Sequence, residues 1–340
     1  MKLAVLCPSE IAYRRFMPAL AQVPAFEFVG LAVATAEESC VGVPGAVPDG
    51  KDEWVAAQVQ KANDFVRDYG GKVYGSYEEL LADDAIEAVY IPLPPALHYP
   101  WAKRALQEGK HVLLEKPFTT SVDTTRELLD LARSQGVAVH ENYMFAFHSQ
   151  IDYVRQVLAE NTLGDLRLIR IDFGFPFRGG NDFRYSKALG GGALLDAGGY
   201  ALKLANLLLG PTARITTAQL SDGRDLEVDL FGSATLANDQ GQVAQVSWGM
   251  DNDYRCNIDV WGSTGTLLSG RILTAPAGFE PTFTIRRNGA EEHVTLPADD
   301  SFRKSIEHFA ACIADPAVRE ARMAEIEHQA TLVEDVRRLG

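Results

Sequence analysis

The feature that most constrains the fold is the regular alternation of short apolar runs with helical patterns before residue 140. Runs such as residues 3–6, 88–91 and 111–114 are apolar throughout, which is typical of strands buried on both faces. Helical patterns follow, for example over residues 11–22 and 122–135. This strand–helix–strand order predicts a parallel sheet with helices on both faces. Such a sheet binds its ligand at the carboxyl ends of the strands.

The pattern changes after His140, where a helix at 151–158 is followed by a region rich in strands. Apolar and polar positions partly alternate in these strands, which predicts a sheet with one covered face. A helix at 193–209 could cover that face, and two more helices, at 302–314 and 319–339, close the chain. Strands are expected at residues 166–173, 226–235, 242–248, 257–261, 282–287 and 293–296. The fold class is therefore α/β, with a parallel domain at 1–140 and an α+β domain at 141–340.

Length, charge and cysteines exclude several classes of protein. The chain has 340 residues, more than one core usually holds, and its net charge of −14 argues against nucleic-acid or anionic-membrane partners. The four cysteines are scattered without a C-x-x-C pair, which argues against a zinc site and a disulfide framework. No apolar stretch at the start is long enough for a signal peptide or a membrane span, so we expect a cytoplasmic protein.

The turn after the first strand is a possible phosphate-binding loop. Dinucleotide folds usually have G-x-G-x-x-G/A there, because backbone amides must approach a pyrophosphate at a helix start. Here Cys7 and Ser9 stand at the glycine positions, and the carboxylate of Glu10 would repel phosphate. Either Ser9 and the helix amides bind phosphate, or Ser9 is an ordinary N-cap. The turn reads Leu6-Cys7-Pro8-Ser9-Glu10-Ile11-Ala12.

A second motif, Glu115-Lys116-Pro117, follows the expected strand at 111–114. A lysine at that strand end would project into the ligand crevice. Its ammonium can polarise a carbonyl or an alkoxide during hydride transfer. Pro117 restricts the backbone after the lysine and is compatible with a cis peptide bond. The alternative is a surface lysine at the start of a loop.

The third motif is the glycine-rich segment at 190–200. Three successive glycines allow a close backbone approach to a ligand before a helix begins. Asp196 and Tyr200 are four residues apart, so they share one face of that helix. A carboxylate and a phenol on one face suit binding of substrate hydroxyls and proton transfer. The alternative is that Asp196 only starts the helix and that Tyr200 is a packed aromatic. The segment reads Gly-Gly-Gly-Ala-Leu-Leu-Asp-Ala-Gly-Gly-Tyr.

In order and spacing, these motifs resemble the glucose–fructose oxidoreductase/inositol dehydrogenase (Gfo/Idh/MocA) family, over nearly the whole chain. Residues 74–81, Ile91-Pro92-Leu93-Pro94 with His98, and residues 141–150 carry the same resemblance. It implies an N-terminal Rossmann domain and a C-terminal domain with a large, open, mainly antiparallel sheet. It also implies a homodimer or homotetramer formed through that sheet. Residues 183–185 with the glycine-rich segment, and residues 11–20, look most like ketoreductases of nucleotide-linked deoxysugars.

The resemblance also implies roles for single residues. Lys116 would be the catalytic lysine beside a nicotinamide, Asp196 would contact the substrate, and Tyr200 would be the general acid, where many members have histidine. Arg184 would face the site. The residues expected to bind the cofactor are Pro8, Ser9, Glu10, Ile11, Thr35, Leu93, Pro94, His98, Glu115, Lys116 and Arg184.

The residue after the second strand bears on the choice between NAD and NADP. An acid there would hold the ribose hydroxyls of NAD, but Thr35 takes that place. The absence of an acid removes a repulsion against the 2′-phosphate of NADP, which slightly favours that cofactor. Arg14 or Arg15 could supply a cation for this phosphate. Glu37 and Glu38 are expected to be a solvated helix start, and residues 40–52 an inserted loop.

Three functions are compatible with this pattern. The favoured one is an NAD(P)-dependent reductase of a ketosugar, in a nucleotide-linked form. An oxidising dehydrogenase of a free sugar or inositol would use the same residues. A regulatory binding protein would explain the altered phosphate loop. No metal site is expected, because His140 and His148 belong to no H-x-x-x-H or H-E-x-x-H string. Cys7 is expected to be a buried small residue and not a reactive thiol.

Overall fold

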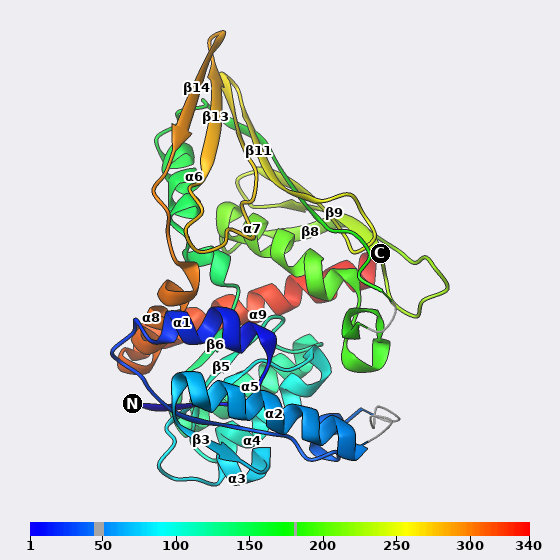
Figure 1. The fold of residues 1–340 in the computed structure, drawn as a ribbon. Helices are drawn as coiled ribbons and strands as arrows, with labels where there is room; N and C mark the ends of the chain where they lie inside the picture. The colour runs from blue at the N-terminus through cyan, green and yellow to red at the C-terminus, as the bar shows by residue number, and fades with distance from the viewer. Residues whose placement is uncertain (44–50, 180–181) are drawn as a thin grey trace. The chain divides into compact units, whose positions relative to one another are not determined.

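The computed structural model describes residues 1–43, 51–179 and 182–340 (Figure 1). These residues form two compact units. The first unit comprises Met1–Asn142, Ala188–Gly190 and Ser305–Ala330, and the second comprises Tyr143–Lys187, Gly191–Lys304 and Thr331–Gly340. Residues 305–330 thus cluster with the N-terminal unit, which a reading along the chain did not anticipate. The linear boundary at 140/141 stays a prediction.

The first unit is built on a parallel sheet of six described strands in the order β3-β2-β1-β4-β5-β6. The expected parallel Rossmann sheet is thereby confirmed. The inner strands carry almost only apolar side chains; β4 is buried along its whole length. Both faces of the sheet must therefore be covered. The strands are β1 (Lys2–Val5), β2 (Glu27–Ala32), β3 (Lys72–Tyr74), β4 (Ala88–Ile91), β5 (His111–Leu114) and β6 (Val139–Glu141).

Helices of the first unit cover this sheet: α2 packs on β2 and β3, and α4 packs on β4 and β5. Helix α2 and strand β3 were not predicted, because α2 is mostly polar and β3 has only three residues. The expected helix at 11–22 is a π-helical segment, η1 (Ala12–Phe16), followed by α1 (Met17–Leu20). The other helical segments of this unit are η2 (Glu38–Cys40), α2 (Lys51–Tyr69), α3 (Tyr77–Leu81), η3 (Pro95–Leu97), α4 (His98–Gln107) and α5 (Val122–Gln135). Helices α8 (Ser301–Ala314) and α9 (Pro316–Leu339) have residues in both units.

The second unit contains a mixed sheet of eight described strands in the order β14-β13-β12-β11-β7-β10-β9-β8. Only β7 and β10 pair in parallel, and the other neighbours are antiparallel, so the large, mainly antiparallel sheet is confirmed. Residues 226–230, expected to be strand, precede β9 as a loop. Strands β8 and β12 were not predicted. The strands are β7 (Leu166–Gly174), β8 (Arg214–Ser221), β9 (Phe231–Ala237), β10 (Val243–Gly249), β11 (Arg255–Gly262), β12 (Gly265–Ser269), β13 (Thr282–Arg287) and β14 (Ala290–Thr295).

One face of this sheet is covered and the other is open. Buried and accessible positions alternate along β9 and β11, as expected for a sheet with one solvated face. Helix α7 (Gly199–Leu209) packs against β7 and β10 on the covered face (Figure 1). A π-helical turn, η7 (Leu194–Gly198), leads into α7 and divides the helix expected at 193–209. The unit also contains η4 (Met144–Phe147), α6 (Ser149–Ala159) and η5 (Phe183–Tyr185), whereas η6 (Lys187–Leu189) has residues in both units.

The inserted loop expected at 40–52 lies mostly in residues 44–50, outside the described residues, while α2 already begins at residue 51. Among the helices that the structure describes, none is both long and apolar enough to cross a membrane.

Candidate active site

The turn after β1 leads directly into a helix at the carboxyl edge of the parallel sheet. The Ser9 hydroxyl accepts a hydrogen bond from the Ala12 amide (3.2 Å), so this side chain caps the helix start. The carboxylate of Glu10 pairs with Arg14 (3.1 Å), and both side chains are well exposed. The repulsion expected between Glu10 and a phosphate is therefore reduced by its neighbour. The amides of Glu10 and Ile11 open the helix, where the first N–H groups have no intrahelical partner.

Cys7 lies in the same turn. Burial raises the pKa of its thiol to about 11, although a hydrogen bond with Tyr77 opposes the shift. The raised pKa disfavours the reactive thiolate at neutral pH, as expected. The residue is half-buried, so the expectation of a fully buried side chain is met only in part.

The end of β2 contains an acid that the sequence analysis misjudged. Glu38 is only 8% exposed, so the expectation of a solvated residue was wrong. Its carboxylate accepts hydrogen bonds from the Thr35 amide (2.8 Å) and from the amides of Tyr77 (3.0 Å) and Glu78 (3.0 Å). The last two open α3, where a negative charge is favourable. The carboxylate of Glu38 therefore binds backbone amides, and Thr35 is the residue at the strand end.

Glu115 and Lys116 follow β5. The Oε1 atom of Glu115 accepts hydrogen bonds from the Tyr90 hydroxyl (2.6 Å) and the Asn142 amide (2.7 Å). Burial raises the pKa of Glu115, against the effect of these two donors. The peptide bond between Lys116 and Pro117 is cis, and Lys116 is half-buried. The lysine thus directly follows a carboxylate that a phenol and an amide hold in place.

His98 connects the loops that follow β4 and β5. It is fully buried, with Nε2 2.7 Å from the Leu93 carbonyl oxygen and Nδ1 2.8 Å from that of Pro117. Burial lowers the pKa of His98 to about 4, although both carbonyls favour the charged ring. The residue joins Leu93 to the segment that carries Lys116. Its expected contact with a cofactor stays a prediction, as do those of Leu93 and Pro94.

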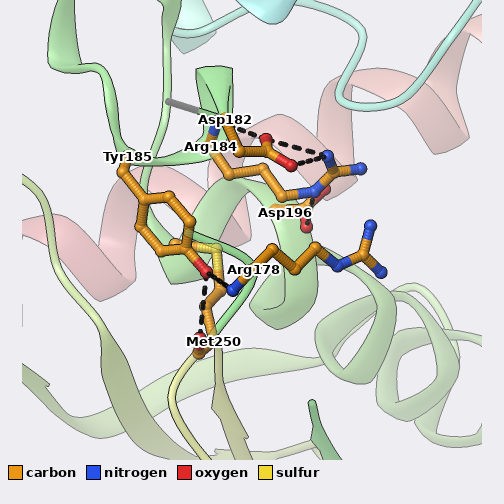
Figure 2. A network of polar contacts seen from close by, with 6 residues as sticks. All are labelled: Arg178, Asp182, Arg184, Tyr185, Asp196 and Met250. Carbon is orange, nitrogen blue, oxygen red and sulfur yellow. Dashed lines mark hydrogen bonds and ion pairs between the residues drawn. The ribbon is translucent and has the colours of Figure 1, made fainter. Parts of the chain in front are cut away.

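In the second unit, Arg184 lies between two acids (Figure 2). Its Nε donates to Asp196 (2.7 Å) and its Nη1 donates to Asp182 (3.0 Å). The three side chains are 21%, 13% and 22% exposed, respectively, so the pairs are largely shielded from water. Burial opposes the charge on Arg184, but the two acids outweigh it, so its pKa is raised. This arrangement orients the Asp196 carboxylate and keeps Arg184 charged.

Arg178 lies beside this network (Figure 2). Its backbone amide donates to the Tyr185 hydroxyl (3.0 Å), which in turn donates to the Met250 carbonyl (3.1 Å). Its guanidinium is 4.6 Å from the ring centroid of Phe175. No acid among the described residues pairs with this guanidinium, and the residue is exposed. Arg178 therefore offers a cation next to Arg184 and its acids.

Protein atoms crowd the glycine-rich segment. A Cβ atom at Gly191 would lie 2.3 Å from the Arg184 carbonyl oxygen, and one at Gly192 would lie 2.4 Å from Asp229. Gly192 also has φ +119°, which side chains rarely adopt. Further on, a Cβ at Gly199 would overlap the Tyr143 hydroxyl. Close backbone packing within this unit is thus enough to require these glycines.

Tyr200 belongs to an aromatic cluster at the start of α7. Its ring centroid lies 5.2 Å from that of Tyr143, 5.6 Å from Phe145 and 5.3 Å from Phe173. The side chain is half-buried, so its packing against these rings is compatible with the expected role in proton transfer. One turn later, Lys203 is fully buried, with its Nζ 6.0 Å from the Tyr143 ring centroid. The burial of Lys203 was not foreseen, because a lysine is ordinarily exposed even in a mostly apolar helix.

The structure brings some predicted residues together within each unit. Leu93, His98 and the segment carrying Lys116 are connected in the first, and Arg184 contacts Asp196 in the second. Lys116 belongs to one unit and Asp196 and Tyr200 to the other, so their joint catalytic role stays a prediction. Residues not foreseen are Asn142, Arg178 and Asp182; Asp182 could have been suspected from its position two residues before Arg184.

Comparison with known proteins identifies the family. Residues 53–143 match a family described as oxidoreductases with an NAD-binding Rossmann fold, and residues 151–268 match the GFO/IDH/MocA C-terminal domain. The dTDP-3,4-didehydro-2,6-dideoxy-alpha-D-glucose 3-reductase of Actinomadura kijaniata is 36% identical, over 99% of this chain and 95% of the relative. The chain belongs to the Gfo/Idh/MocA family. It is accordingly an NAD(P)-dependent oxidoreductase, as the motifs indicated.

Solved structures and further relatives agree with this family assignment. The crystal structure of KijD10, a 3-ketoreductase from Actinomadura kijaniata in complex with NADP and TDP-benzene, has a TM-score of 0.89 and 35% identity, over 100% of this chain and 97% of that one. A D-xylose 1-dehydrogenase (NADP(+)) of Haloferax volcanii is 35% identical over 71% of this chain and 74% of the relative. The family thus includes relatives that act on nucleotide-linked sugars and on free sugars.

Proposed function

We propose that this Gfo/Idh/MocA oxidoreductase is an NADP-dependent reductase of a dTDP-linked 3-ketosugar. The observation that carries the proposal is the identity of 36% with a dTDP-ketosugar 3-reductase along almost the entire length of both chains. The D-xylose dehydrogenase matches only 71% of this chain, which favours the nucleotide-linked substrate over a free sugar.

The proposed chemistry is reduction of a ketone at C3. When bound, the reduced nicotinamide supplies the hydride that attacks the carbonyl carbon. Lys116 would polarise the carbonyl oxygen with its ammonium. Tyr200 would donate the proton that this oxygen takes up, and Asp196, oriented by Arg184, would hold a neighbouring sugar hydroxyl.

The end of β2 fits NADP better than NAD. Binding of the ribose hydroxyls of NAD needs a free carboxylate at this position. Thr35 stands at the strand end, so this position itself carries no negative charge that would repel a 2′-phosphate. Two acids follow it: Glu37 is exposed, and the oxygens of Glu38 already accept three backbone amides. The helix start at Glu10 and Ile11 supplies amides for the pyrophosphate.

A diphosphate in the substrate needs a cation, and Arg178 meets that requirement. Its guanidinium is exposed, stacks on Phe175 and has no acidic partner among the described residues. An arginine can bind a phosphate through two parallel hydrogen bonds. A free sugar has no group that would use this charge.

The test is a substrate panel with the purified protein, in which consumption of NADPH and NADH is followed. We expect dTDP-linked 3-ketosugars to be reduced with NADPH at a kcat/KM at least about 100-fold above that for any free sugar, because phosphate contacts add binding energy. Oxidation of a polyol or free aldose without turnover of the nucleotide sugar would instead identify a free-sugar dehydrogenase. Failure to bind either cofactor in calorimetry would favour the regulatory alternative.

A single substitution tests the contribution of Arg178. Arg178→Ala should raise KM for the nucleotide sugar about tenfold with little change in kcat, because a remote binding contact is lost. Arg287→Ala is the matched control, since Arg287 is also exposed, lies in the same unit and forms no ion pair with any described residue. Equal effects of both variants would remove Arg178 from the proposal.

The open face of the second unit's sheet supports a homo-oligomer, a homodimer or a homotetramer. Phe231 and Trp261, on β9 and β11, are 47% and 51% exposed, which is high for large apolar side chains. Sedimentation equilibrium would check this, since a monomer at micromolar concentration contradicts it. We also propose a cytoplasmic location, in keeping with four free cysteines.

A further inference from the structure

A cluster of two histidines and a cysteine lies in the first unit, formed by residues far apart in sequence. His140 comes from the edge strand β6, and His308 and Cys312 lie one turn apart on α8. Their ligating atoms all lie within 4.8 Å of one another. His140 and Cys312 are fully buried, and His308 is half-buried. No role in the proposed reduction uses these three side chains.

The distances suit a tetrahedral metal ion. The Sγ atom of Cys312 lies 3.5 Å from Nδ1 of His308. Zinc bonds of ~2.3 Å to sulfur and ~2.0 Å to nitrogen, at a tetrahedral angle, place these two atoms about 3.6 Å apart. The observed separation therefore already matches one edge of the tetrahedron. The ligand atoms of the cluster are at most 4.8 Å apart, so His140 needs to approach by at most about 1.4 Å to reach the length of a tetrahedral edge.

Neighbouring hydrogen bonds orient His140 as a metal ligand. The Ser305 hydroxyl donates to Oδ1 of Asn142 (2.8 Å), whose amide nitrogen donates to Glu115 (2.7 Å). The hydroxyl proton is thus used, so Ser305 accepts the bond from Nε2–H of His140 (2.9 Å). The neutral ring then has its lone pair on Nδ1. A histidine that donates its other N–H to an oxygen is typical of metal centres.

We propose that His140, His308 and Cys312 form a binding site for a zinc-like divalent cation, with water as the fourth ligand. Zn²⁺ prefers imidazole and thiolate ligands, as in this cluster, to carboxylates. The half-buried His308 leaves a path for the ion and its water. The bound ion links β6 to α8 and thereby holds the returning segment of the chain on the sheet. The proposal is independent of the proposed reductase activity.

The charges around the cluster are consistent with a thiolate ligand. The guanidiniums of Arg322 and Arg319 lie near the Cys312 thiol and favour its ionised form, and the carboxylate of Glu325 adds a negative charge that favours the bound ion. Binding therefore replaces the thiol proton with the metal.

The test is a titration of the full-length protein, first stripped with a chelator, with Co²⁺ and then Zn²⁺. We expect one Co²⁺ per chain, a thiolate-to-cobalt charge-transfer absorption, and displacement of cobalt by zinc. Cys312→Ser should abolish that absorption and weaken binding at least about 100-fold. Cys256→Ser is the matched control, because Cys256 is a buried cysteine of the second unit. It should leave the absorption unchanged.

Two further variants make the result decisive. Ser305→Ala should keep the absorption and weaken binding about tenfold, because it only loosens the orientation of His140. His308→Ala, at a half-buried position, is used if Cys312→Ser does not fold, and it should also weaken binding at least about 100-fold. The proposal is overturned if wild type takes up no stoichiometric metal, or if the absorption persists in Cys312→Ser.

Discussion

In the first unit, burial favours uncharged forms of the polar groups beside Lys116, whereas in the second unit the groups around Asp196 keep their charges. His98 and Glu115 are surrounded by backbone carbonyls, a phenol and an amide, and burial shifts the pKa of each towards its neutral form. Arg184 is also buried, but its two acidic partners raise its pKa. The same loss of water thus has opposite outcomes, depending on whether a counter-charge is present.

This contrast assigns different tasks to the two units. Beside Lys116, burial opposes the charge of Glu115, whose carboxylate is held by a phenol and an amide. The ion pairs of the second unit instead fix the direction of a carboxylate. The following predictions test the contrast, beginning with the largest effect.

Removal of the Lys116 ammonium should have the largest effect. Lys116→Ala is expected to lower kcat about 10³-fold, because a preorganised positive charge next to the reacting oxygen is lost. Steady-state kinetics with NADPH and a dTDP-linked ketosugar measures it. Lys103→Ala, at an exposed lysine of the same unit that pairs with Glu127, should retain full activity. A Lys116→Ala enzyme within tenfold of wild type would place the reacting oxygen elsewhere.

Acid should destabilise the first unit more than the second. Burial lowers the pKa of His98, His111 and His308 to about 4, from 6.5. The unfolded chain binds more protons between these values, so stability is complete above pH 6.5 and falls as the pH decreases to 4. His98 alone accounts for about 3 kcal/mol of this loss.

Hydrogen exchange at pH 7, 5.5 and 4.5 measures the effect in each unit. Amides of β4 and β5 should lose protection before those of β9 and β10, because among the histidines of the second unit only His148 has a lowered pKa, and its shift is milder. His98→Asn should reduce the pH dependence of unfolding. Simultaneous loss of protection in both sheets would show that the contrast has no thermodynamic consequence.

Loss of Arg184 should have an intermediate effect. Arg184→Ala leaves Asp182 and Asp196 largely buried without their shared partner, which should cost about 2 kcal/mol in the free energy of unfolding. Urea denaturation measures it. Arg214→Ala, which breaks an exposed pair with Asp239, should cost less than about 1 kcal/mol. Similar costs for both would mean that water reaches the Arg184 network.

Glu115→Gln should have the smallest effect. The raised pKa of Glu115 means that its ionised form costs stability at neutral pH, and this cost disappears as the pH falls. An amide oxygen can still accept from Tyr90 and Asn142. We expect unfolding free energies within about 1 kcal/mol of wild type, with a weaker dependence on pH above 4.5. A loss of more than about 2 kcal/mol would show that a charged carboxylate stabilises the fold.

Much of the fold was predictable, because burial of whole strands leaves a strong apolar signal. The runs at β1, β4 and β5 and the helix periods at α4 and α5 located the parallel sheet. Helix α2 was missed because few of its residues face the core, and β8 because only one of its eight positions is buried. Local pattern also does not reveal that residues 305–330 join the first unit, since that depends on contacts across more than 160 residues of chain.

The site was predictable where a residue belongs to a recognisable motif, and less so elsewhere. Arg184 and Asp196 were both foreseen, but the second acid, Asp182, was not. Glu38 was misjudged because its partners, Tyr77 and Glu78, lie some 40 residues further along the chain. Its burial follows from α3 beginning beside the end of β2, which only the three-dimensional structure reveals.

The late return of the chain to its first unit bears on how the protein is made. Met323 and Ile326 are fully buried members of the same hydrophobic core as β1, β4 and β5. The ribosome adds Met323 182 residues after the end of β6 (323 minus 141), so the core of the first unit stays incomplete while the strands of the second sheet are synthesised. A fragment cut after residue 142 would expose this apolar surface to water and to other nascent chains.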